Sequence, residues 1–173
     1  MKKRILVVLT AVICLLVGAC TSAEPITVDC GDFSITCLRG WTVSTPEGAD
    51  DANRVASIYL PEKDNYTSSV TITTQQAKGL KAEDFNEAYA QSLVEASKES
   101  AGVEFTLEGV EHTTLGSRNA VVIRYSGVKD GHNVVVNEQL VPTDEQLYRF
   151  TYFCVNDSDT ANLEDVMNSV IFK

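Results

Sequence analysis

Residues that could carry catalytic or metal chemistry are few and scattered. The 173-residue chain has two histidines, His112 and His132, and each stands alone, without partners at zinc-ligand spacing. It contains no Gly-x-Ser-x-Gly elbow and no glycine-rich phosphate loop. Its 24 Asp and Glu residues form carboxylate pairs by chance, so such pairs do not predict glycosidase chemistry. The sequence therefore predicts no enzyme, no metal site and no cofactor.

The first nineteen residues have the composition of an export signal. Lys2, Lys3 and Arg4 precede an apolar run from Ile5 to Ala19, which only Thr10 interrupts. A charged start followed by an apolar stretch of this length is typical of a secretory signal. A spanning helix needs about 20 apolar residues, and this run is shorter.

Small residues stand directly before Cys20, in the order Val17-Gly18-Ala19-Cys20. The arrangement resembles a bacterial lipoprotein signal, in which an aliphatic residue and two small residues precede the cysteine. The resemblance implies cleavage before Cys20 and attachment of a diacylglyceryl group to its sulfur. Residues 1–19 would then be the signal peptide and 20–25 a lipidated tether. The alternative is an ordinary secretory signal with Cys20 at a chance position.

The rest of the chain is strongly acidic. Residues 1–19 hold three of the fourteen Lys and Arg residues and no acid, so the remainder has a formal charge of −13. Anionic lipid and nucleic acid repel such a chain. Acyl chains can hold it, at about 0.8 kcal/mol per buried methylene. We therefore expect an extracytoplasmic protein that the lipid on Cys20 anchors to the cell membrane, or to an outer membrane where one exists, without a nucleic-acid partner.

Three cysteines remain after the anchor, namely Cys30, Cys37 and Cys154. An odd number in an exported domain allows one disulfide at most within the chain. Cys30 and Cys37 flank a predicted turn, whereas Cys37 and Cys154 would join the first strands to the last. Their spacing does not choose between these pairings.

Residues 26–173 predict one α+β domain with an antiparallel sheet. Alternation of apolar and polar residues predicts strands, which are Ile26 to Cys30, Phe33 to Leu38, Arg54 to Leu60, Ser69 to Thr74 and Val103 to Val110. The Asp130-Gly131 pair predicts a tight hairpin turn, because it supplies positive φ. This turn lies in a predicted three-stranded meander, composed of Ala120 to Ser126, Val134 to Val141 and Leu147 to Val155.

Two helices are predicted by apolar stripes at helical spacing. The long one runs from Lys81 to Ala101, and we expect its stripe to pack on the sheet. That stripe is Phe85, Tyr89, Leu93 and Ala96. The second runs from Thr160 to about Val170, with a stripe of Leu163, Val166, Met167 and Val170. We expect Ile171 and Phe172 to lie beneath the sheet edge.

Two acidic features have alternative interpretations. Glu47, Asp50 and Asp51 could bind a cation such as calcium, although a solvated loop is the preferred interpretation. Glu138 falls on the apolar face of the hairpin, opposite Ile123 if the Asp-Gly turn sets the register. A register shifted by one residue would expose Glu138, and we favour that register or an edge position.

The order of the elements resembles the PsbP/Mog1-like family over nearly all of the chain after residue 25. The matching residues are Phe33-Ser34-Ile35 leading to Gly40-Trp41, then Gly116, Ala120 and Tyr125, and the closing Ser169 to Phe172. The chain departs from the family in having Leu38-Arg39, without proline, before Gly-Trp. It also departs at its close, where Val170 and Ile171 separate Ser169 from Phe172. The resemblance implies an α+β fold and a non-enzymatic role, since family members are mostly accessory subunits, binders of a small GTPase or bacterial lipoproteins.

The sequence thus favours a non-catalytic accessory or protein-interaction module of the cell envelope, with an unidentified envelope protein as partner. The alternative is a small-ligand-binding lipoprotein that uses a groove between the long helix and the sheet. Trp41, the single tryptophan, is the candidate ligand platform, although an anchor in the core is the preferred interpretation.

Overall fold

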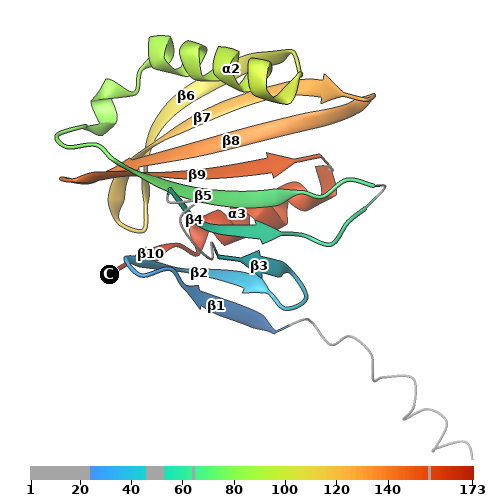
Figure 1. Ribbon diagram of the computed structural model, residues 1–173, viewed down its shortest axis with the longest axis horizontal. Coiled ribbons are helices and arrows are strands. Elements are labelled where there is room, and N and C mark those ends of the chain that lie inside the picture. The colour runs from blue at the N-terminus through green and yellow to red at the C-terminus, as the bar shows by residue number, and fades with distance from the viewer. Residues whose placement is uncertain (1–23, 46–52, 64, 156) are drawn as a thin grey trace, which may run out of the picture.

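Two antiparallel sheets and two helices form the fold (Figure 1). The computed structural model describes residues 24–45, 53–63, 65–155 and 157–173. The large sheet has the order β3-β4-β5-β9-β8-β7-β6. Its strands are β3 (Thr42–Ser44), β4 (Arg54–Tyr59), β5 (Ser69–Gln76), β6 (Phe105–Leu115), β7 (Arg118–Lys129), β8 (His132–Pro142) and β9 (Gln146–Cys154).

The small sheet brings the two ends of the described chain together. It has the order β1-β2-β10, with β1 (Pro25–Asp29), β2 (Phe33–Leu38) and β10 (Ile171–Phe172). The helices are α2 (Glu87–Ala101) and α3 (Thr160–Asn168), preceded by the short 3₁₀ turns η2 (Ala82–Asp84) and η3 (Asp157–Asp159). These elements confirm the predicted α+β fold with an antiparallel sheet, a long helix and a C-terminal helix.

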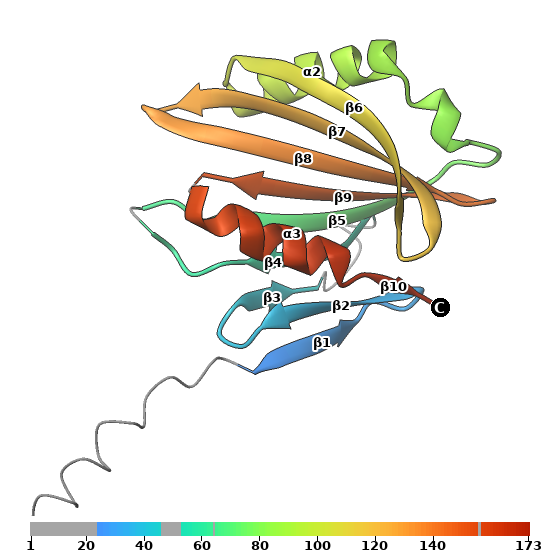
Figure 2. The same ribbon diagram turned by 180° about the vertical axis from the view of Figure 1, so that it is seen from behind.

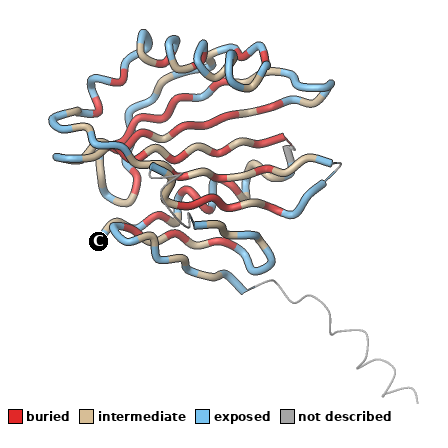
Figure 3. Tube along the Cα trace, in the orientation of Figure 1, coloured by how far each residue is buried: buried red, intermediate tan, exposed pale blue. Residues whose placement is uncertain are grey.

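The helices cover opposite faces of the large sheet, so the core is divided in two (Figures 1 and 2). One half lies under α2, between the helix and β6, β7 and β8. The other half lies between the sheet, α3 and the small sheet, and four aromatic rings meet there at centroid distances of 5.2 to 6.3 Å. These rings are Phe33, Tyr148, Phe150 and Phe172. Figure 3 shows buried positions gathered on the strands of the large sheet, where they alternate with less buried ones along β9.

The hairpin of β7 and β8 has the register that its turn predicts. Asp130 has φ 52° and Gly131 has φ 83°, and Lys129 pairs with His132 across the turn. Two residues with positive φ are what a type I′ turn requires. The register places Ile123 opposite Glu138. The meander is one strand longer than predicted, because β6 runs on to Leu115 and pairs with β7.

The long helix begins later than predicted. Asn86 is its N-cap and accepts a hydrogen bond from the Tyr89 N–H at 3.2 Å, so α2 begins at Glu87. Ala90 and Val94 are the buried residues of α2, and Ala96 is exposed. The prediction was wrong for Ala96, because each helical residue advances about 100° and Ala96 lies about 200° from Val94.

The chain termini of the domain differ from the predictions in two details. The predicted stripe of α3 is fully buried, but Ile171 is 65% exposed. Phe172 pairs with the inward-facing Phe33, so its neighbour Ile171 points outward, since successive side chains alternate along a strand. At the other end β1 begins at Pro25, inside the predicted tether, and the Glu24 carbonyl accepts a hydrogen bond from the Arg39 N–H at 3.2 Å.

Candidate functional site

Trp41 lies far from the long helix with which it was predicted to form a ligand groove. It follows β2 and is half-buried against the core half that contains α3, whereas α2 covers the opposite face of the sheet. Gly40, at φ 93°, allows the turn that brings the Trp41 N–H to the Leu38 carbonyl at 3.3 Å. The ring borders a small hollow of about 190 Å³ with Leu38 and Val166. The structure therefore separates Trp41 from the predicted groove.

A hollow does lie between the long helix and the sheet. It measures about 490 Å³ and is lined by the first turns of α2 and the middle of β6. Leu107 and Val110 supply apolar surface, while Glu87 and Glu108 make the rim acidic. His112 also lines it, so one of the two histidines lies at a hollow that a small molecule could enter.

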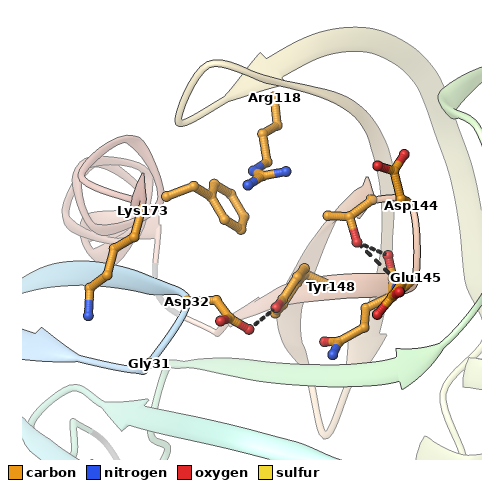
Figure 4. A pocket seen from close by; sticks show the side chains of 10 residues that line it. Gly31, Asp32, Arg118, Asp144, Glu145, Tyr148 and Lys173 are labelled. Atoms are coloured by element: carbon orange, nitrogen blue, oxygen red, sulfur yellow. Dashed lines mark hydrogen bonds between the residues drawn. The ribbon is translucent and has the colours of Figure 1, made fainter.

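A larger group of polar side chains meets in a second cleft of about 460 Å³, where the small sheet meets the ends of β7 and β9 (Figure 4). The turn after β1 supplies Asp32, the start of β7 supplies Arg118, and β9 supplies Tyr148. The Tyr148 hydroxyl donates a hydrogen bond to the Asp32 carboxylate, across 116 residues of sequence. The Arg118 guanidinium lies over the Phe172 ring, 4.8 Å from its centroid.

The chemistry of this cleft is hydrogen bonding and charge recognition. Burial, followed by the hydrogen bond from Tyr148 to Asp32, raises the pKa of Tyr148 to about 12. The phenol therefore keeps its proton at neutral pH and acts as a donor, so it cannot serve as a general base there. Arg118 adds a cation fixed on an aromatic face, which is a common arrangement for guanidinium groups.

Glu138 is buried, contrary to the exposed position that we favoured from the sequence. The Asp-Gly register holds, and the Glu138 side chain is 1% exposed. Its Oε1 accepts hydrogen bonds from the Tyr125 hydroxyl at 2.5 Å and from Arg149 Nη2 at 2.6 Å, and its Oε2 forms an ion pair with Arg149 Nε. A carboxylate can be buried when it is paired and hydrogen-bonded in this way.

The buried carboxylate also connects the sheet to the long helix. The Ser97 hydroxyl on α2 lies 3.0 Å from the Tyr125 hydroxyl, which itself donates to Glu138. Burial, and then the charge of Glu138, raise the pKa of Tyr125. Tyr125 is therefore a permanent donor at neutral pH, and the chain of polar contacts from Ser97 to Arg149 stabilises α2 on the sheet.

The remaining candidate residues do not converge. His132 packs against Tyr66 with ring centroids 4.4 Å apart. Within the described residues, no group of three or more His, Cys, Asp or Glu side chains could hold a metal ion. The same residues include no helix that is long and apolar enough to cross a membrane. Cys20 and the acidic cluster of Glu47, Asp50 and Asp51 lie outside the described residues.

No disulfide joins Cys30, Cys37 or Cys154 among the described residues. Cys37 pairs with Ile26 in the small sheet, while the Cys30 N–H donates to Phe33 at the other end of β2. Four residues along a strand span about 13 Å, and a disulfide needs Cα atoms within about 7 Å. The fold therefore does not allow a Cys30–Cys37 bridge, and a bridge to Cys154 stays a prediction.

Comparisons with known proteins show the fold. No protein-family model matches the chain, and no curated protein matches its sequence. PsbP of the cyanobacterium Synechocystis sp. PCC 6803 matches in structure with a TM-score of 0.64 and 10% identity, over 90% of this chain and 96% of that one. LpqN of Mycobacterium tuberculosis, described as involved in cell envelope biogenesis, matches with a TM-score of 0.54 and 17% identity, over 87% and 91%.

A protein of Bacteroides thetaiotaomicron also matches, with a TM-score of 0.52 and 10% identity, over 88% of this chain and 49% of that one. Identities this low show a shared fold and nothing about shared function. The chain therefore has a PsbP-like fold, as the order of its predicted elements implied.

Proposed function

We propose that this protein is a lipid-anchored, extracytoplasmic accessory module of the cell envelope, which binds an envelope protein and catalyses no reaction. The observation that carries the proposal is Cys20, directly after Val17-Gly18-Ala19 at the end of a charged and then apolar segment. A domain with a formal charge of −13 needs an anchor other than electrostatic attraction to reach an anionic membrane. Acyl chains on Cys20 supply that anchor.

The fold supports the non-catalytic part of the proposal. The polar clusters of the described residues hold Tyr125 and Tyr148 as protonated donors, and neither is placed beside a histidine and a nucleophile. LpqN, which shares the fold at 17% identity, is described as involved in cell envelope biogenesis. An envelope role for this chain agrees with that neighbour.

Metabolic labelling tests the anchor. Cells that express the full chain are grown with an alkyne-tagged fatty acid, and the purified protein is probed for the tag. We expect a labelled wild-type protein, an unlabelled Cys20→Ser variant and a labelled Cys30→Ser control. An unlabelled wild-type protein, or a Cys20→Ser variant that keeps the label, would refute the anchor.

Crosslinking in intact cells tests the partner. We expect one envelope protein to be recovered with the chain in a fixed ratio, and to be lost when the Cys20→Ser variant leaves the membrane. Failure to recover such a protein under several growth conditions would count against the accessory role.

A second candidate function is a small-ligand carrier, which the hollow of about 490 Å³ between α2 and β6 favours. Native mass spectrometry of protein purified from its own cells tests this candidate. A retained small molecule that a Gln91→Trp variant excludes would support a carrier. A measured mass equal to that of the protein alone would rule out this function.

A further inference from the structure

An apolar corner of the small sheet lies beside the point where the described chain begins. Pro25 is the Cα partner of Leu38 in the β1–β2 register. The turn from Leu38 to Trp41 therefore lies next to the first strand (Figures 1 and 2). An anchor attached to the chain shortly before Pro25 would therefore also keep the turn from Leu38 to Trp41 close to the anchored surface.

The corner combines an exposed leucine with a half-buried tryptophan. Leu38 is 39% exposed on the outward face of β2, while the inward-facing Phe33, Ile35 and Cys37 are buried. Trp41 is half-buried, and its ring borders the hollow of about 190 Å³ beside α3. A strand end that exposes leucine beside a tryptophan provides a small apolar surface with an amphipathic ring at its edge.

The length of the preceding chain limits how far this corner can lie from Cys20. Five residues lead from Cys20 to Pro25, and an extended chain spans at most about 3.3–3.6 Å per residue. Pro25 therefore lies within about 18 Å of the Cys20 Cα atom. A lipid on Cys20 places that atom in the headgroup layer, so Leu38 and Trp41 lie within reach of the bilayer surface.

We propose that Leu38 and Trp41 form a membrane-contacting corner, which inserts into the interfacial layer of the bilayer and orients the domain. This inference rests on the proposed lipid anchor. Tryptophan rings favour the interface between headgroups and acyl chains. The long side chain of Arg39 can extend from the corner toward the headgroups.

The corner binds a lipid surface, and burial of apolar side chains drives the binding. The Glu24 carbonyl accepts a hydrogen bond from the Arg39 N–H, and Asp165 lines the hollow beside Leu38 and Trp41, so two exposed acids lie at the corner. The corner therefore gains little from anionic lipid, and a zwitterionic surface suffices. In this orientation α2, at the far side of the molecule from β1, faces away from the bilayer and is available to a protein partner (Figure 1).

The single tryptophan makes the corner directly measurable, since all tryptophan fluorescence comes from Trp41. The mature chain is attached to phosphatidylcholine vesicles in two forms, as the native lipoprotein and through an N-terminal histidine tag on a nickel-chelating lipid. The vesicles contain phospholipid brominated near the carbonyl end of its acyl chains. The tagged form tests the corner even if Cys20 carries no lipid, and the intact mass of the native form tests the anchor separately.

We expect the brominated lipid to quench Trp41 fluorescence about twofold in the tagged form, as for an interfacial ring. Leu38→Asp should remove the quenching without changing the urea midpoint, because Leu38 is on the surface. Val128→Asp is the matched control, since Val128 is 60% exposed on the β7–β8 hairpin, and it should leave the quenching unchanged. Unquenched wild-type protein, or equal quenching in Leu38→Asp, would overturn the membrane-contacting corner.

Discussion

Glu138 and Arg149 share a charge pair whose two ends differ in access to water. The Glu138 side chain is 1% exposed and the Arg149 side chain is 38% exposed. Losing one partner of a buried pair leaves the other charge unpaired, at a cost of about 3–5 kcal/mol. Because Arg149 can reach water and Glu138 cannot, the two possible deletions are not equivalent.

We expect Arg149→Met to lower the free energy of unfolding by about 3–5 kcal/mol, because it leaves the Glu138 carboxylate buried and unpaired. Glu138→Gln should cost only about 1–3 kcal/mol, since the amide can still accept from Tyr125 and Arg149 can turn to solvent. Urea unfolding at neutral pH measures both. An equal or smaller loss in Arg149→Met would contradict this account of the pair.

Tyr148 gives the stability of the domain an alkaline limit. Its folded pKa is raised to about 12, above the value near 10 of an unfolded tyrosine. The phenol holds its proton more tightly in the folded state. Its contribution to the free energy of unfolding is therefore full below about pH 10 and is lost as the pH rises through about 12. Tyr148→Phe should therefore show a shallower loss of stability between these two pH values than the wild type. Urea unfolding midpoints measured across this pH range test the prediction. Equal falls in the midpoint with pH for the wild type and for Tyr148→Phe would contradict it.

At the scale of elements, the backbone that leads into β6 approaches β7 closely at Gly127. A Cβ atom built there would lie 2.6 Å from the Glu104 carbonyl oxygen and 2.8 Å from Val103 Cγ1. The nearest atom belongs to the backbone of Glu104, so the backbone before β6 would have to shift. The sequence gives no sign of this constraint, because the glycine stands in an otherwise ordinary strand pattern.

Gly127→Ala should therefore lower the free energy of unfolding by about 1–3 kcal/mol, the usual cost of overpacking. Gly109→Ala is the matched control, because no atom lies within 4 Å of the Cβ atom it would add on the neighbouring strand. We expect the control to change stability by less than about 0.5 kcal/mol. Equal losses in the two variants would show that the backbone contact at Gly127 is unimportant.

Local patterns predicted the elements well, and they failed where contacts are distant in sequence. Alternation located β2 and β4, and the Asp130-Gly131 pair set the register of the β7–β8 hairpin. That register places Glu138 on the apolar face, but its counter-ion Arg149 lies on the next strand, so the sequence did not show how the carboxylate could be buried. The Asp32–Tyr148 contact joins residues 116 positions apart, so no pattern in the neighbouring sequence predicts it.

At the scale of the whole molecule, the large sheet separates the two helices and the hollows beside them. Trp41 and the start of the fold lie with α3 and the small sheet, while α2 and its hollow cover the other face. The sequence predicted both helices, but it did not predict which face each covers, because amphipathic stripes look alike on either side. The proposed membrane contact and partner surface follow from that separation.

The charge of the molecule predicts how it should respond to salt. A chain of formal charge −13 beyond residue 19 is not held to anionic lipid by attraction. We expect washing of isolated membranes with about 1 M salt, which reduces the screening length to about 3 Å, to release none of the protein. A detergent should release it. Release by salt alone would indicate a peripheral, charge-dependent attachment.

The central claim is that the acidic domain is held at the membrane by lipid on Cys20. The most direct measurement is mass spectrometry of the N-terminal peptide of the mature protein, purified in detergent from its own membranes. We predict that this peptide begins at Cys20 and carries a diacylglyceryl mass on the sulfur. A peptide that begins at another residue, or an unmodified Cys20, would contradict the claim.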